Sequence, residues 1–105
     1  MFLARVTGSV VATQKAAAMT GQKLLMVEPL RIDPANRTQL IGVGRTFVVV
    51  DVLGAGLGET ILIVQGSSAR MMPETEKLPI DAAIIGIVDN VMVGGQIVYS
   101  ARQVS

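Results

Sequence analysis

The sequence contains no cysteine, no histidine and no tryptophan, and its only aromatic residues are Phe2, Phe47 and Tyr99. Without cysteine the chain cannot form a disulfide, a thiolate nucleophile or an iron–sulfur site. Without histidine it lacks the base of a Ser-His-Asp triad, and the two absences together remove the usual zinc ligands. We therefore expect no metal and no cofactor, and we expect that the protein is not an enzyme.

Charge is also scarce. Charged residues make up 16% of the chain, against a usual figure of about 25%, while apolar residues make up 50%. The 9 basic and 8 acidic residues leave a net charge of +1, which argues against a surface built to grip phosphates. Three aromatic residues are too few for a platform on which single-stranded nucleic acid stacks. A small protein with few charges suggests that other protein covers part of its surface.

Long apolar runs are missing as well. No clean run exceeds the length of residues 47–50, which is far shorter than the roughly 20 apolar residues of a transmembrane helix. Residues 1–5 place their one charge after the apolar positions, unlike a signal peptide. We expect no membrane partner and a cytoplasmic location. The 105 residues correspond to one domain, which we expect to span residues 1–105.

Short apolar segments with period-two alternation or many β-branched residues predict six strands. They cover residues 4–12, 23–28, 46–53, 59–64, 82–91 and 96–100. Pro29 is expected to end the second strand, and Gly94-Gly95 to form a hairpin turn before the sixth. Many short strands separated by glycine-rich turns are typical of a small all-β barrel or sandwich.

The segments between these strands have turn-rich compositions. Residues 13–21 are compatible with a short helix closed by Gly21 or with a loop. Residues 31–39 and 73–79 are polar and indicate surface loops. Residues 67–72 favour a single helical turn, with Ser67 as its N-cap and Pro73 after its end.

The pattern Gly54-x-Gly56-x-Gly58 invites comparison with phosphate-binding loops. Such a loop needs a helix after it, whereas here a predicted strand follows, and the chain contains no Gly-Lys pair. We interpret the glycines as positions of positive φ or of close backbone approach, including approach between neighbouring subunits. Ser67-Ser68 near Arg70 lacks an adjacent base that would activate a nucleophile, so helix capping is the favoured interpretation.

Four stretches, in this order and spacing, resemble the EutN/CcmL family of bacterial microcompartment shell proteins. They are Gly8-Ser9-Val10-Val11-Ala12-Thr13-Gln14-Lys15 with Gly21-Gln22-Lys23-Leu24-Leu25, then residues 50–59 (VDVLGAGLGE), residues 66–70 (GSSAR) and residues 79–89 (PIDAAIIGIVD). The resemblance extends from Met1 to about Val91, and the tail after Val91 is less diagnostic.

The resemblance implies a five-stranded, OB-like β-barrel with a short helical turn, assembled as a cyclic ring of five. Such homopentamers cap the vertices of polyhedral shells in the bacterial cytoplasm, next to hexameric shell proteins. It also implies that the glycine-rich loop and the following turn lie near the five-fold axis or the subunit interface. The residues concerned are Gly54, Ala55, Gly56, Gly58, Glu59, Ser67, Ser68 and Arg70.

Because an OB-like barrel does not fix function, a domain that binds single-stranded nucleic acid is the first alternative. The charge and the aromatic count oppose that alternative. A barrel that binds a small ligand or uses carboxylate or lysine chemistry is the second, and the absence of histidine and cysteine opposes it.

Overall fold

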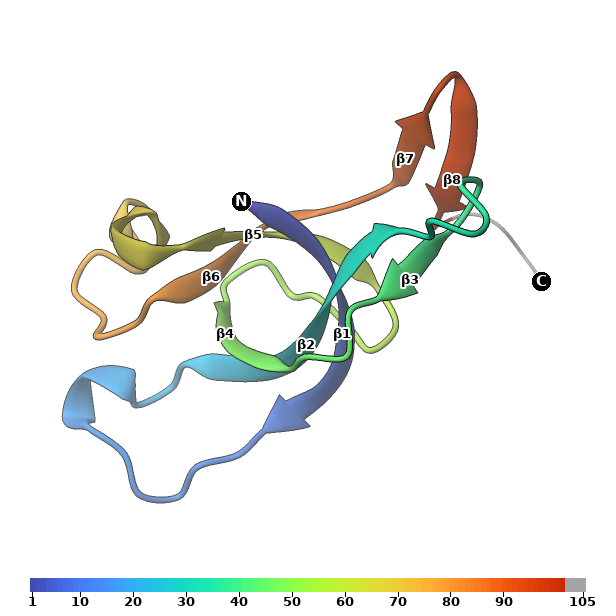
Figure 1. Ribbon diagram of the computed structural model, residues 1–105. Coiled ribbons are helices and arrows are strands. Elements are labelled where there is room, and N and C mark those ends of the chain that lie inside the picture. Colours follow the sequence, from blue (N-terminus) through green and yellow to red (C-terminus); the bar gives the residue numbers. More distant parts are fainter. Residues whose placement is uncertain (102–105) are drawn as a thin grey trace.

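The computed structural model describes residues 1–101, and these form an all-β structure with two isolated 3-10 turns (Figure 1). The strands are β1 (Phe2–Val10), β2 (Lys23–Ile32), β3 (Leu40–Gly42), β4 (Phe47–Asp51), β5 (Thr60–Gln65), β6 (Ala82–Ile87), β7 (Asn90–Val93) and β8 (Gln96–Ser100). The turns are η1 (Ala17–Met19) and η2 (Gly66–Arg70). No helix within these residues is long and apolar enough to cross a bilayer.

Five of the strands close into a barrel. The order β1-β5-β6-β4-β2 returns to β1, because β1 pairs with β5 on one edge and with β2 on the other. Counted along the chain, the barrel strands follow the order 1-2-3-5-4, and every pairing is antiparallel except that of β4 with β6. The expected five-stranded, OB-like barrel is therefore confirmed.

The barrel interior is built by alternation along each strand. Ala4 and Val6 of β1, like Ile61 and Ile63 of β5, are fully or almost fully buried in one apolar cluster. The intervening residues face outwards or pack under the surrounding segments, as the period of two requires. The β1–β2 register shifts between Val6 and Gly8, which marks a bulge where the strand bends to close the barrel.

The second strand is longer than expected. Pro29 does not end β2, which continues to Ile32 and pairs there with the short strand β3. Pro29 lacks an N–H but its carbonyl still accepts a hydrogen bond from Val43, so the proline costs the sheet a single donor. The short strand β3 was not predicted, since it follows the polar loop directly and spans only three residues.

The polar loop between β2 and β3 is ordered by side chains. Asp33 accepts hydrogen bonds from the Gln39 amide and from the Ala35 backbone N–H, both at 2.8 Å. The Gln39 amide, followed by the Ala35 N–H, holds the pKa of Asp33 below its usual value. The predicted surface loop over residues 31–39 is thus confirmed in its centre, although Arg31 and Ile32 belong to β2.

Two other predicted boundaries were wrong. The strand expected over residues 82–91 breaks at Val88 and Asp89, so β6 ends at Ile87 and a separate strand, β7, begins at Asn90. The single helical turn exists, but it begins at Gly66 with Gln65 as its N-cap, and no side chain caps it. Ser67 therefore lies inside the turn and is not its cap. The stretch over residues 13–21 contains one 3-10 turn, η1.

The predicted hairpin at Gly94-Gly95 is confirmed. Both glycines have positive φ, as a tight two-residue turn between antiparallel strands requires. The hairpin of β7 and β8 stands away from the barrel in Figure 1. The described chain is correspondingly elongated, with principal extents of 45 × 24 × 24 Å.

Removing volume from the barrel interior should destabilise the fold. Ile61 is fully buried, so we expect Ile61→Ala to lower the free energy of unfolding by about 2–5 kcal/mol. Urea denaturation at one fixed protein concentration measures this difference. The exposed Val11→Ala is the control, with an expected change within about 0.5 kcal/mol. Equal stabilities of the two variants would contradict the placement of Ile61 in the core.

Candidate functional site

The glycine-rich loop connects β4 to β5, and a buried carboxylate holds its first half. Asp51, the last residue of β4, is 5% exposed. Its Oδ1 accepts hydrogen bonds from the N–H groups of Leu53 (2.9 Å) and Gly54 (3.1 Å), and its Oδ2 accepts one from Ala55 (2.8 Å). Three consecutive backbone donors thus converge on one side chain, which fixes the path of the loop as it leaves the strand.

Lys23, the first residue of β2, completes this arrangement. Its Nζ lies 3.2 Å from Oδ2 of Asp51 and donates a hydrogen bond of 2.9 Å to the carbonyl of Ala55. Lys23 and Asp51 are also cross-strand partners in the β2–β4 pairing. The ammonium group therefore links the two strands to the loop, and it compensates the charge of a carboxylate that has no exposure of its own.

The second half of the loop is held by its own residues and by β1. The Glu59 carboxylate accepts a hydrogen bond from the Gly56 N–H, and the Glu59 N–H donates to the Gly56 carbonyl. Gly58 donates to the carbonyl of Val6, and Val6 donates to the carbonyl of Glu59. Ala55, between the two halves, is 1% exposed and belongs to the barrel core. The loop is consequently part of the barrel wall.

The glycines of the loop differ in what they require. Gly54 and Gly58 both have a φ of +84°, so the predicted positive φ is confirmed at these two positions. Gly56 does not have a positive φ, and a Cβ there would meet Oε1 of Glu59 at 3.3 Å. Gly54 and Gly58 are thus needed for backbone conformation, whereas at Gly56 a side chain would press on the Glu59 carboxylate.

The second candidate segment, η2, follows β5. Ser67, Ser68 and Arg70 are exposed, whereas Ala69 is buried against Val64 and Ala83 in a second apolar cluster. Arg70 donates a hydrogen bond of 2.6 Å from Nη1 to the carbonyl of Ile80, which ties the turn to the segment before β6. The hydroxyls of Ser67 and Ser68 therefore lie on the surface of a turn that is held by the burial of Ala69 and by the hydrogen bond of Arg70.

The two candidate segments lie at opposite ends of one strand. Gly58 and Glu59 lead into β5 at Thr60, and η2 begins immediately after β5 ends at Gln65. A strand of this length spans about 20 Å. The eight candidate residues therefore do not form one cluster. The glycine-rich loop and η2 can contact the same neighbouring subunit only if β5, which lies between them, runs along that contact.

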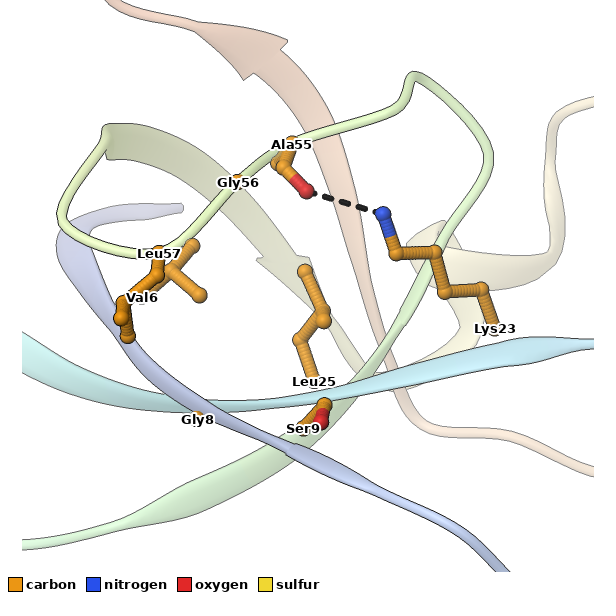
Figure 2. Close-up of a pocket in the computed structure, with 8 residues that line it drawn as sticks. All are labelled: Val6, Gly8, Ser9, Lys23, Leu25, Ala55, Gly56 and Leu57. Atoms are coloured by element: carbon orange, nitrogen blue, oxygen red, sulfur yellow. Dashed lines mark hydrogen bonds between the residues drawn. The ribbon is translucent and has the colours of Figure 1, made fainter.

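A pocket of about 300 Å³ lies beside the glycine-rich loop (Figure 2). Its lining comes from β1, β2 and the loop: Val6, Gly8, Ser9, Lys23, Leu25, Ala55, Gly56 and Leu57. Val6, Leu25 and Ala55 belong to the barrel core, so the pocket reaches from the surface to the interior. Leu57, at its edge, is 77% exposed.

The sequence interpretation missed Lys23, Asp51 and Leu57 as parts of this region. A signal for the first two was present, because opposite charges stood at the start of one predicted strand and near the end of another. The pocket itself had no such signal, since it results from how the loop crosses the barrel. Within residues 1–101, no group of three or more His, Cys, Asp or Glu side chains is placed to hold a metal ion.

Comparison with known proteins gives consistent relatives. The sequence profile of the family described as ethanolamine utilisation protein EutN/carboxysome matches residues 1–89. The chain is 44% identical over 99 residues to the bacterial microcompartment shell vertex protein EutN of Escherichia coli K12, an alignment that covers 94% of this chain and 98% of the relative.

Solved structures share the fold over nearly the whole chain. CcmL of Gloeobacter violaceus superposes with a TM-score of 0.85 at 39% identity, covering 98% of this chain and all of that one. A pentameric microcompartment shell protein, GrpN of Rhodospirillum rubrum, superposes with a TM-score of 0.72 at 44% identity, covering 89% of this chain and 98% of that one.

Removing the Asp51 carboxylate should release the glycine-rich loop. We expect Asp51→Ala to lower the free energy of unfolding by about 2–3 kcal/mol, because the buried Ala55 N–H loses its acceptor and Lys23 loses its ion-pair partner. Hydrogen exchange at the amides of residues 53–55 should accelerate.

The matched control is Asp51→Asn, which keeps one acceptor oxygen and should give a smaller loss of stability and a smaller acceleration of exchange. Unchanged exchange at Ala55 in Asp51→Ala would show that the carboxylate does not hold the loop.

Proposed function

The chain belongs to the EutN/CcmL family, and from this membership we propose that it is a structural shell protein that forms homopentamers at the vertices of a bacterial microcompartment. The observation that carries this proposal is the match of almost the full chain to shell vertex proteins, one of them pentameric in its solved structure. The closed barrel supports it, since a barrel whose strands pair on both edges is a rigid building block for a wall.

The role of such a ring is geometric. Hexagonal tiles form a flat sheet, and the sheet can close into a polyhedron only when pentagons are inserted. A cyclic ring repeats one heterologous contact, so every subunit presents two different surfaces, one to each neighbour. The outer edge of the ring then meets the adjoining tiles, which we propose are hexameric shell proteins in the bacterial cytoplasm. No step of this role needs a catalytic residue or a cofactor.

We also propose that the glycine-rich loop and η2 border the five-fold axis or the neighbouring subunit. The loop is held rigidly by Asp51 and Glu59, and η2 by Arg70, so both present fixed surfaces. Five copies of Ser67 or of the Glu59 carboxylate around a pore would bias passage by hydrogen bonding or charge. Because Glu59 already accepts the Gly56 N–H, its capacity for other partners is reduced.

The oligomeric mass tests the proposed assembly. We expect native mass spectrometry of the full chain to give a species of five times 11.0 kDa at micromolar concentration. A chain that is monomeric at every concentration would overturn the proposal. A different ring size would retain the family fold but would remove the argument from pentagonal closure.

A titration with single-stranded DNA separates the shell role from the alternative of a nucleic-acid-binding OB domain. With a net charge of +1 and three aromatic residues, we expect no saturable binding at low salt. Affinity that falls steeply as salt is added would instead support the alternative.

A substitution at Gly56 should separate ring assembly from folding. We expect Gly56→Val to raise the concentration below which the ring dissociates by at least tenfold. The free energy of unfolding of the monomer should change little, since the new Cβ meets only the flexible end of Glu59. The contrasting variant is Gly58→Val, which forces a β-branched residue to a φ of +84° and should destabilise the fold itself. An unchanged oligomer mass profile for Gly56→Val would count against a loop at the interface.

A further inference from the structure

The β7–β8 hairpin is the least supported part of the described chain. Its two strands pair with each other and make few or no contacts with the barrel strands. Its base is closed by a hydrogen bond of 2.8 Å from the Ala101 N–H to the Asp89 carbonyl. An isolated two-stranded hairpin is marginally stable in water, so a partner surface is needed to hold this one in place.

The composition of the hairpin points the same way. Residues 90–100 contain no charged side chain. Met92 and Ile97 lie directly opposite each other across the two strands, and they are 60% and 59% exposed. Free strand edges on soluble proteins are usually protected by charges, especially lysine, and this hairpin has none. An exposed, uncharged apolar pair on a projecting element is typical of a buried interface.

The size of the exposed surface agrees with a covered element. A compact monomer of this mass exposes about 5,600 Å², whereas this chain exposes 6555 Å². The Cα radius of gyration is 14.6 Å, against roughly 13 Å for a compact chain of about 100 residues. The excess is of the order of the roughly 800 Å² that one partner contributes to a standard interface.

A receiving surface is present on the same chain. The pocket beside the glycine-rich loop is open to the surface and lined mainly by apolar groups, with Leu57 at its edge. Its one charged lining residue, Lys23, is already paired with Asp51. An apolar hollow that reaches core residues gains dispersion contacts and loses exposed area when an apolar side chain fills it.

We propose that the hairpin of one subunit lies on the next copy of this chain and inserts the Met92–Ile97 pair into that copy's pocket at Val6, Leu25 and Leu57. The occupant is a second copy because a cyclic ring needs two different, complementary patches on every subunit, and the hairpin and the pocket are such a pair. This inference rests on the proposed ring and deepens it, since it assigns the two surfaces of the repeated contact.

Cross-linking between copies tests the contact directly, because the natural chain has no cysteine. Ile97→Cys protein labelled with ¹⁵N is mixed with unlabelled Leu57→Cys protein, and the re-formed rings are treated with a short bismaleimide. We expect mass spectrometry to show a cross-link between one labelled and one unlabelled chain. Ile97→Cys mixed with Val11→Cys is the matched control, since Val11 is 88% exposed and lies outside both patches.

Charge substitutions supply an independent readout. We expect Ile97→Asp to raise the concentration at which the ring dissociates by at least tenfold, and Val11→Asp to change it by less than twofold. Hydrogen exchange at Ile61 should stay slow in both, which shows an intact barrel. If Ile97→Asp misfolds, the cross-linking result stands alone.

The outcomes separate this inference from the proposed function. A pentamer that gives no Ile97–Leu57 cross-link, and whose dissociation is the same in Ile97→Asp and Val11→Asp, overturns the hairpin contact and leaves the vertex function standing. A wild-type chain that never assembles overturns both.

Discussion

The structure depends on β1 being hydrogen-bonded along both of its edges. Residues 2–5 of β1 pair with β5, and residues 4–10 pair with β2, so that Ala4 and Arg5 have partners on both sides. This double pairing turns a sheet into a barrel and removes the open edges that would otherwise invite uncontrolled pairing. The bulge between Val6 and Gly8 lies in the same strand, just beyond the residues that are paired on both sides.

Closure of the barrel also explains why the glycine-rich loop is rigid. The chain leaves β4 at Asp51 and must cross to β5, whose neighbour is β1. The Asp51 carboxylate and Lys23 fix the beginning of this crossing, and the pairing of Gly58 and Glu59 with Val6 fixes its end. Ala55 fills the core between these two anchors. The crossing leaves beside it the pocket that reaches the interior.

Much of this fold could be predicted from the sequence, and the errors have physical causes. Alternation and β-branched runs located all the barrel strands, because each has one buried face. The prediction that Pro29 ends β2 was wrong because a proline whose carbonyl still accepts a hydrogen bond can lie within a strand, here where β2 leaves the barrel. The break at Val88 and Asp89 was missed because apolar residues stand on both sides of it, whether they face the core in β6 or lie in the hairpin. The pocket was inaccessible to sequence reasoning, since it depends on three segments meeting in space.

The structure shows where in the chain the charged residues are scarce. Residues 70–81 carry Arg70, Glu74, Glu76, Lys77 and Asp81, as expected of a segment that meets water. From Ala82 to Ala101 the only charge is Asp89. Burial in the barrel accounts for β6, but β7 and β8 lie outside the barrel, and all their residues are exposed or only partly buried in the single chain. The shortage of charge is therefore concentrated where the isolated subunit has no core to explain it. In the proposed ring, a neighbouring subunit would take the place of the core and cover this apolar surface.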